Sequence, residues 1–189
     1  DNFYDWWKNI DKIILLIVLG LFFLGLFFSL VSTSLIASDK FNTNSYYFFL
    51  KHLSLIFLGV LILLFFSILN QEILIKLCII LFFVCLVTLI LVPFLGIEVK
   101  GSRRWLDIPF LPRFQPVEIL KPFFIIFTSI LLSLRKRNLY FKYILSAAVL
   151  IPILLFLIYQ PDLGQSLLII MVWLALVFSS SINIFLFFS

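Results

Sequence analysis

Charged and hydrogen-bonding side chains gather in one short stretch of this sequence, residues 100–121. The stretch carries five basic and two acidic side chains, whereas 12% of the whole chain is charged and 64% is hydrophobic. Arginine presents a planar fork of donors that matches phosphate oxygens, so Arg103, Arg104 and Arg113 suit an anionic ligand. Trp105 can stack against a sugar or an apolar tail. The pattern predicts a phosphate-binding loop, with anionic lipid headgroups as the plainer alternative ligand.

A helix start follows these arginines and carries an acid and a base. Gln115 precedes Pro116, which suits the first turn of a helix because its missing N–H leaves no bond unmade there. Glu118 and Lys121 are three residues apart and therefore share one face. An ionised group inside a membrane span costs roughly 2.5–3.5 kcal/mol on insertion scales, so such groups usually face a cavity and a partner. The pair either starts a helix at the interface or lines a polar cavity open to the outer leaflet.

A second acidic position is Asp162, at the edge of another apolar run. Two interpretations stay open: Asp162 caps the following helix and does nothing more, or it faces Lys121 across a cavity. The sequence shows no nucleotide-binding loop, metal-ligand cluster or Ser-His-Asp set. His52, the single histidine, is interpreted as an interfacial residue, and Cys78 and Cys85 as packing residues of one helix.

The elements that carry these residues are long apolar runs. A mean hydropathy of +1.25 lies far outside the soluble range, and about 20 apolar residues are needed to cross the ~30 Å hydrocarbon core as a helix. We therefore expect an all-α polytopic membrane protein. The runs predict six spans, with the start of a seventh at residue 184: 13–36, 53–69, 77–95, 116–134, 143–159 and 164–181.

Orientation follows from the basic residues of the loops. With the N-terminus inside, seven lysines and arginines lie in cytoplasmic segments and six outside, and the densest cluster, residues 135–137, lies inside. We therefore predict a cytoplasmic N-terminus and one transmembrane domain over residues 1–189. The chain starts at Asp1 without a methionine and stops at Ser189 within an apolar run, so we expect it to be part of a longer protein.

Three motifs carry a family resemblance. They are Lys100-Gly-Ser-Arg-Arg-Trp-Leu-Asp, Arg113-Phe-Gln-Pro-Val-Glu-Ile-Leu-Lys121 and Gln160-Pro-Asp-Leu-Gly164. Together they resemble the SEDS family (shape, elongation, division and sporulation), and their details are more similar to its division-type FtsW members than to its elongation-type RodA members. One departure is Val117, where the family usually has serine.

The resemblance implies the N-terminal part of a ten-span peptidoglycan glycosyltransferase in the bacterial inner membrane. Such an enzyme polymerises lipid II, an undecaprenyl-pyrophosphate-linked disaccharide pentapeptide, on the periplasmic side. It acts in division or elongation with a class B penicillin-binding protein and other proteins of those machineries; no nucleic acid is expected. The presumed catalytic carboxylate lies beyond Ser189, so residues 1–189 alone are expected to be inactive.

The resemblance also implies which residues form the substrate cavity. No resident metal or other cofactor is assigned, although a divalent cation is an alternative to Arg103, Arg104 and Lys121 for stabilising the departing pyrophosphate. A lipid II flippase and a membrane scaffold of the division machinery remain competing functions, because each would use the same spans and charges. The expected cavity residues are Arg103, Arg104, Trp105, Gln115, Glu118, Lys121 and Asp162.

Overall fold

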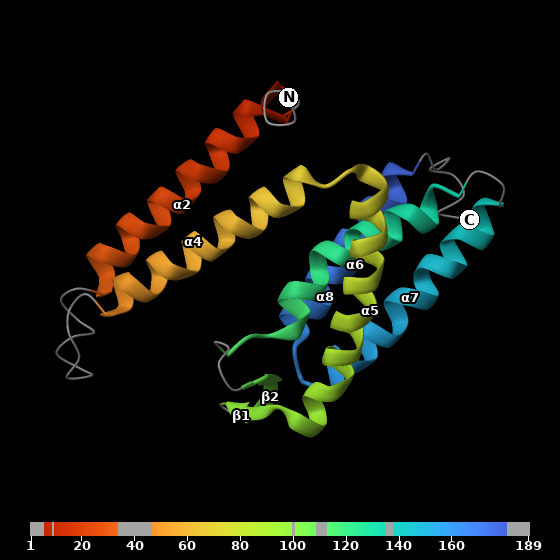
Figure 1. The fold of residues 1–189 in the computed structure, drawn as a ribbon. Coiled ribbons are helices and arrows are strands. Elements are labelled where there is room, and N and C mark those ends of the chain that lie inside the picture. The colour runs from red at the N-terminus through yellow and green to blue at the C-terminus, as the bar shows by residue number, and fades with distance from the viewer. Residues whose placement is uncertain are drawn as a thin grey trace. The chain divides into compact units, whose positions relative to one another are not determined.

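The computed structural model describes residues 6–8, 10–33, 47–99, 101–108, 113–134 and 138–180. A helix occupies each of the six predicted span positions, which confirms the all-α class (Figure 1). The predicted seventh span lies outside the described residues. The helices are α2 (Lys12–Thr33), α4 (Tyr47–Ile68), α5 (Gln71–Leu95), α6 (Pro116–Leu132), α7 (Leu139–Tyr159) and α8 (Leu163–Ser179).

Four of these helices are long and apolar enough to cross a membrane: α2, α4, α5 and α7. Helix α8 is apolar but has 17 residues, and α6 also has 17. At 1.5 Å per residue, 17 residues reach about 25 Å, which is shorter than the ~30 Å hydrocarbon core. The spans predicted at 116–134 and 164–181 are thus each shorter in the structure than the sequence indicated.

Residues Asp1–Asn70 and Gln71–Ser189 form two compact units, which are described separately. In the first unit, α2 and α4 pack side by side (Figure 1). Asp11 caps α2, because its carboxylate Oδ1 accepts the N–H groups of Ile13 and Ile14 at 2.9 and 3.2 Å. The Trp6 indole donates to the Ser67 hydroxyl at 2.9 Å. The assignment of residues 1–189 to one domain stays a prediction.

The second unit contains the hydrophobic core, built from α5, α6, α7 and α8. The rings of Phe82 on α5 and Phe127 on α6 stack with centroids 4.5 Å apart. The Trp173 indole of α8 donates to the Ser146 hydroxyl of α7 at 3.1 Å. The fully buried core side chains include Phe82, Leu89, Leu120, Phe124, Ile153, Leu157 and Ile169. These contacts pack the four helices against one another.

Between α5 and α6 the chain forms a hairpin that the sequence did not predict. Strands β1 (Ile97–Val99) and β2 (Ser102–Trp105) pair antiparallel. Gly101 at the turn has φ of 79°, a conformation that is strained for residues with a Cβ. At the end of α5, a Cβ on Gly96 would collide with the carbonyl oxygen of Val92. Glycines at these two positions therefore let the hairpin fold back directly onto the end of α5.

The pairing of the hairpin contains one irregularity. Glu98 pairs with Arg103, but Ile97 pairs with Trp105, so Arg104 is an extra residue in β2. Such a bulge bends a strand and re-aims its side chains. The strands escaped prediction because they are short and their charged residues give no clean apolar alternation of the kind that identifies a half-buried strand.

Candidate functional site

Asp162 is the acidic centre of a polar cluster in the second unit. The residue is only 6% exposed and immediately precedes α8. Its carboxylate accepts a hydrogen bond from the Gln115 amide at 2.7 Å and one from the Gln165 backbone N–H at 3.4 Å. The Arg104 guanidinium lies 3.6 Å away. Asp162 is thus a helix cap and also the partner of two side chains that are distant in sequence.

Arg104 connects the hairpin to the turn before α8. Its guanidinium donates to the backbone carbonyls of Gln160 and Pro161, at 3.2 and 2.5 Å. These carbonyls lie at the C-terminal end of α7, where a cation also interacts favourably with the helix dipole. Because Arg104 is the extra residue of β2, the irregular pairing coincides with the side chain that reaches this turn. The Arg104 guanidinium lies beside one oxygen of the Asp162 carboxylate, and the Gln115 amide donates to the other.

A second group of polar side chains connects α6 to α8. The Lys121 ammonium lies 2.5 Å from the Glu118 carboxylate, one helical turn away. Lys121 also donates to the side-chain carbonyl of Gln165 at 3.1 Å, and the Gln165 amide donates to Glu118. Glu118, Lys121 and Gln165 thus form a closed triangle. Because the Gln165 backbone N–H also donates to the Asp162 carboxylate, the triangle and the Asp162 cluster are joined.

The structure pairs Lys121 and Asp162 differently from the sequence hypothesis. Lys121 has Glu118 and Gln165 as its partners, whereas Asp162 has Arg104 and Gln115. Glu118 is three residues before Lys121 on the same helix face and so pairs with it locally, while the Asp162 carboxylate is already engaged by Arg104 and Gln115. The two charges belong to one polar network, with Gln165 between them.

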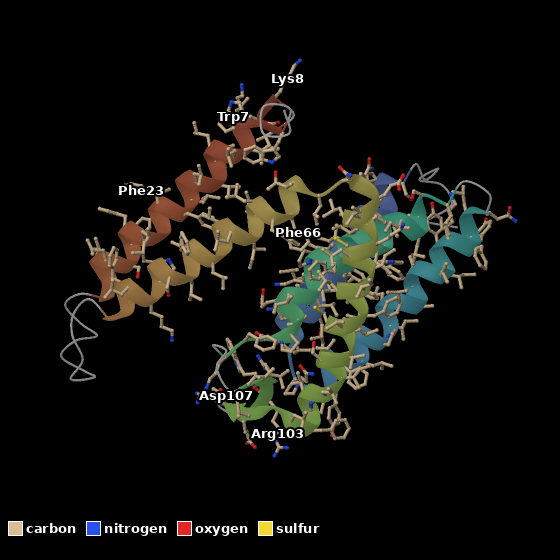
Figure 2. The ribbon with its side chains drawn as sticks, in the orientation of Figure 1. Trp7, Lys8, Phe23, Phe66, Arg103 and Asp107 are labelled. Carbon is tan, nitrogen blue, oxygen red and sulfur yellow. The ribbon has the colours of Figure 1, made fainter. Side chains whose placement is uncertain are left out.

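Two predicted cavity residues lie apart from this network. Arg103 pairs with Glu98 at 3.7 Å, and both side chains are largely exposed. Figure 2 shows Arg103 on the hairpin, directed outward. Trp105 is also exposed. Arg113 pairs with Asp107 at 2.9 Å.

Two glutamines in the network were absent from the predicted cavity residues. Gln165 links both polar groups, and the Gln160 amide donates to the carbonyl of Leu89 on α5 at 3.3 Å. Both flank the Pro-Asp-Leu-Gly run that the sequence analysis singled out. Their position on both sides of that run could have identified them from the sequence as network residues. A glutamine side chain both donates and accepts hydrogen bonds, so it can join groups of either charge.

The divalent cation considered as an alternative stays a prediction. Among the described residues, no three histidine, cysteine, aspartate or glutamate side chains gather in one place. Asp162 and Glu118 are each engaged by a basic side chain and by an amide.

Comparison with known proteins identifies the family. The family model for FtsW, RodA and SpoVE, described as cell cycle proteins, matches residues 11–189. The chain belongs to this family. The SEDS resemblance is therefore confirmed, and a SEDS protein with several apolar helices is a multi-pass helical membrane protein.

Curated SEDS relatives share moderate identity with the chain. The probable peptidoglycan glycosyltransferase FtsW of Buchnera aphidicola is 31% identical over 183 residues, which cover 94% of this chain and 45% of the relative. The protein of the same name in Nitrosomonas europaea is 31% identical over 108 residues, covering 56% of this chain and 28% of the relative. The chain thus spans less than half the length of these relatives.

Solved SEDS structures have the same fold. The rod shape determining protein RodA of Thermus thermophilus matches with a TM-score of 0.65 at 26% identity, covering 84% of this chain and 54% of that one. A chain of a peptidoglycan synthase complex, studied for the coordination of polymerization and crosslinking, matches with a TM-score of 0.58 at 26% identity. That match covers 77% of this chain and 44% of the other.

Proposed function

We propose that the intact protein is a peptidoglycan glycosyltransferase that polymerises lipid II on the periplasmic side of the bacterial inner membrane. In this proposal the N-terminus is cytoplasmic, and a class B penicillin-binding protein cross-links the product. Family membership and the names of the relatives support the reaction class. The observation that carries the proposal is the joined network of Asp162, Gln165 and Lys121 at one end of an otherwise apolar helical unit.

The chemistry of lipid II polymerisation fits such a network. A sugar hydroxyl attacks an anomeric carbon, the bond to the pyrophosphate breaks, and negative charge develops on the departing pyrophosphate. A cation placed at that charge lowers the barrier. Lys121 is our candidate, because its ammonium is partly exposed beside Glu118. The base that takes the hydroxyl proton is proposed to lie outside this chain, as the resemblance implies.

Arg104 and Asp162 are proposed as positioning residues. The Arg104 donors are directed at the Gln160 and Pro161 carbonyls and toward Asp162, so they hold the turn that presents Gln165. The sequence analysis considered Arg103, Arg104 and Lys121 for stabilising the departing pyrophosphate. We now propose Lys121 alone for that role. Arg103 lies with Glu98 and takes no part in the network.

The experiment that tests the proposal is lipid II polymerisation by the purified full-length protein with its class B partner. We expect glycan chains from wild type and about a hundredfold less product from Lys121→Met and Asp162→Asn, the scale on which an electrostatic group contributes to catalysis. The matched control is Lys76→Met, which removes an exposed lysine near the start of α5. Thermal unfolding establishes that all variants are folded.

The alternatives make different predictions for the same proteins. An intact wild-type complex that makes no chains would contradict the proposal, and movement of lipid II across vesicle bilayers would then favour the flippase. A wild-type complex that binds its partners but shows neither activity would favour the scaffold. If both folded variants synthesise chains at the wild-type rate, the network organises the fold and takes no part in the reaction.

A further inference from the structure

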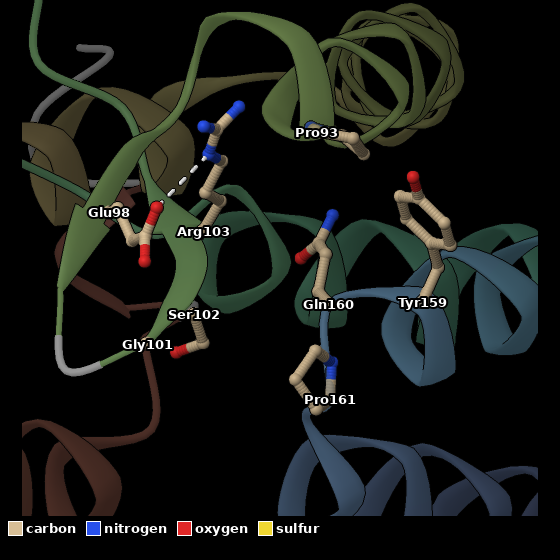
Figure 3. Close-up of a pocket in the computed structure, with 8 residues that line it drawn as sticks. All are labelled: Pro93, Glu98, Gly101, Ser102, Arg103, Tyr159, Gln160 and Pro161. Carbon is tan, nitrogen blue, oxygen red and sulfur yellow. Dashed lines mark ion pairs between the residues drawn. The ribbon is translucent and has the colours of Figure 1, made fainter.

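A polar cavity lies beside the hairpin and is lined in part by Gln160 and Pro161. Its volume is about 420 Å³, and its walls come from the hairpin, from Pro93 near the end of α5, and from Tyr159 at the end of α7. Figure 3 shows Arg103 and Glu98 on one side of this space and Tyr159 on the other. None of the reaction steps proposed above uses this cavity.

Glu98 and Arg103 give the cavity one negative and one positive group. They are cross-strand partners, 3.7 Å apart, with side chains 59% and 54% exposed. An ion pair that exposed contributes only about 0–1 kcal/mol. Each group can therefore exchange its partner for a ligand group at little cost. Ser102 also lines the cavity and adds a hydroxyl that can donate or accept.

The two helix ends that contribute Pro93 and Tyr159 to the cavity carry exposed apolar side chains. Phe94 and Leu95 follow Pro93 in the last turn of α5 and are strongly exposed, as is Tyr159 at the end of α7. Both helices are long enough to cross a membrane. Aromatic residues at the ends of membrane spans lie at the headgroup level. We therefore expect the cavity to lie at headgroup depth, where the exposed apolar side chains of the same helix ends can contact acyl chains.

We propose that this cavity binds the headgroup of a zwitterionic phospholipid that carries a primary ammonium group. Arg103 binds the phosphate, since guanidinium matches phosphate oxygens, and Glu98 accepts hydrogen bonds from the ammonium. A purely anionic headgroup would leave Glu98 facing negative charge. A quaternary ammonium has no N–H to donate. The site is independent of the proposed polymerase activity.

The test is binding of single phospholipids to the purified full-length protein, measured by native mass spectrometry. The probes are dioleoyl phosphatidylethanolamine, phosphatidylglycerol and phosphatidylcholine. We expect phosphatidylethanolamine to bind most tightly, and Arg103→Gln and Glu98→Gln each to weaken its binding about tenfold, the value of one charge-assisted hydrogen bond. The matched controls are Lys76→Gln and Glu72→Gln, which remove an exposed base and acid at the other end of α5 and should leave affinity unchanged.

Three results would overturn the proposal. The first is equal affinity for the three lipids. The second is unchanged phosphatidylethanolamine binding in folded Arg103→Gln and Glu98→Gln proteins. The third is a preference for phosphatidylglycerol that depends on Arg103 alone, which would indicate an anion site. Because lipid binding is measured without turnover, a protein that fails as a polymerase can still pass this test.

Discussion

Individual residues of the network have more than one partner, and Asp162 is the clearest case. It caps α8 through the Gln165 N–H, accepts from the Gln115 amide and lies beside the Arg104 guanidinium. A buried carboxylate that loses its compensating partners is strongly destabilising. A loss of activity on removing Asp162 therefore combines effects on structure and chemistry. Asparagine separates them best, because it keeps the capping oxygen and removes the charge.

The pairing of Arg104 with Asp162 predicts an energetic coupling between them. In a double-mutant cycle of Arg104→Gln and Asp162→Asn, we expect a coupling of about 1 kcal/mol in the free energy of unfolding, since the residues share one network. The measurement is denaturant unfolding of the full-length protein in detergent. The exposed pair Arg113 and Asp107 is the control and should couple more weakly. A larger coupling of Asp162 to Lys121 than to Arg104 would contradict this assignment.

The sequence could predict most residues of the network but not their pairing. Residue type and helix-start position identified Glu118, Lys121 and Asp162, because an ionised group beside an apolar run is costly unless it has a partner or faces a cavity. The contacts join residues 44 to 57 positions apart, and they depend on how the helices and the hairpin pack. Local patterns carry no information about such distances, so Gln165 was missed and Arg103 was included.

At the scale of elements, the helices were predictable and the hairpin was not. Apolar runs located all six helices, but α4, α5 and α7 begin four to six residues earlier than predicted. Their first turns hold polar and interfacial residues, such as Lys51, Glu72 and Lys142, which continue the helix beyond the apolar run. The hairpin depends on two glycines and on its contact with the end of α5, and neither shows as periodicity.

Helix packing predicts that removing two buried hydroxyls changes the free energy of unfolding in opposite directions. Thr128 on α6 is fully buried, and its hydroxyl has no hydrogen-bond partner within the part of the chain that the structure describes, whereas Ser146 on α7 accepts from Trp173. We expect Thr128→Val to raise the free energy of unfolding by about 1 kcal/mol and Ser146→Ala to lower it by a similar amount. Denaturant unfolding in detergent measures both. Equal destabilisation by the two substitutions would show that Thr128 has a partner in the membrane.

On the scale of the whole molecule, the two units differ in how they use apolar residues. The candidate membrane windows of α2 and α4 contain no buried residue, whereas those of α5 and α7 are 28% and 22% buried. In a membrane, lipid tails are as apolar as a protein core, so helix association depends on packing contacts rather than on removal from water. The second unit has those contacts, and it also holds the entire polar network.

This difference predicts unequal effects of removing a phenylalanine ring. Phe124 is 0% exposed in the core of the second unit, and Phe23 on α2 is 70% exposed and points outward (Figure 2). We expect Phe124→Ala to lower the free energy of unfolding by about 2 kcal/mol or more through the cavity it leaves. Phe23→Ala should change it by less than about 1 kcal/mol. Thermal unfolding in detergent ranks the two, and a larger effect at Phe23 would place that ring in a packed interface.

The extra residue in β2 limits which insertions and deletions the hairpin can accept. Arg103 pairs with Glu98, whereas the next residue, Arg104, contacts Asp162. The two arginines differ because a strand presents successive side chains to different surroundings. A one-residue shift in a strand exchanges those surroundings for every later position. Substitutions on the exposed side of the hairpin can therefore accumulate, whereas a single inserted or deleted residue between Gly101 and Trp105 would turn Arg104 away from Asp162. The hairpin tolerates changes of residue type more readily than changes in its number of residues.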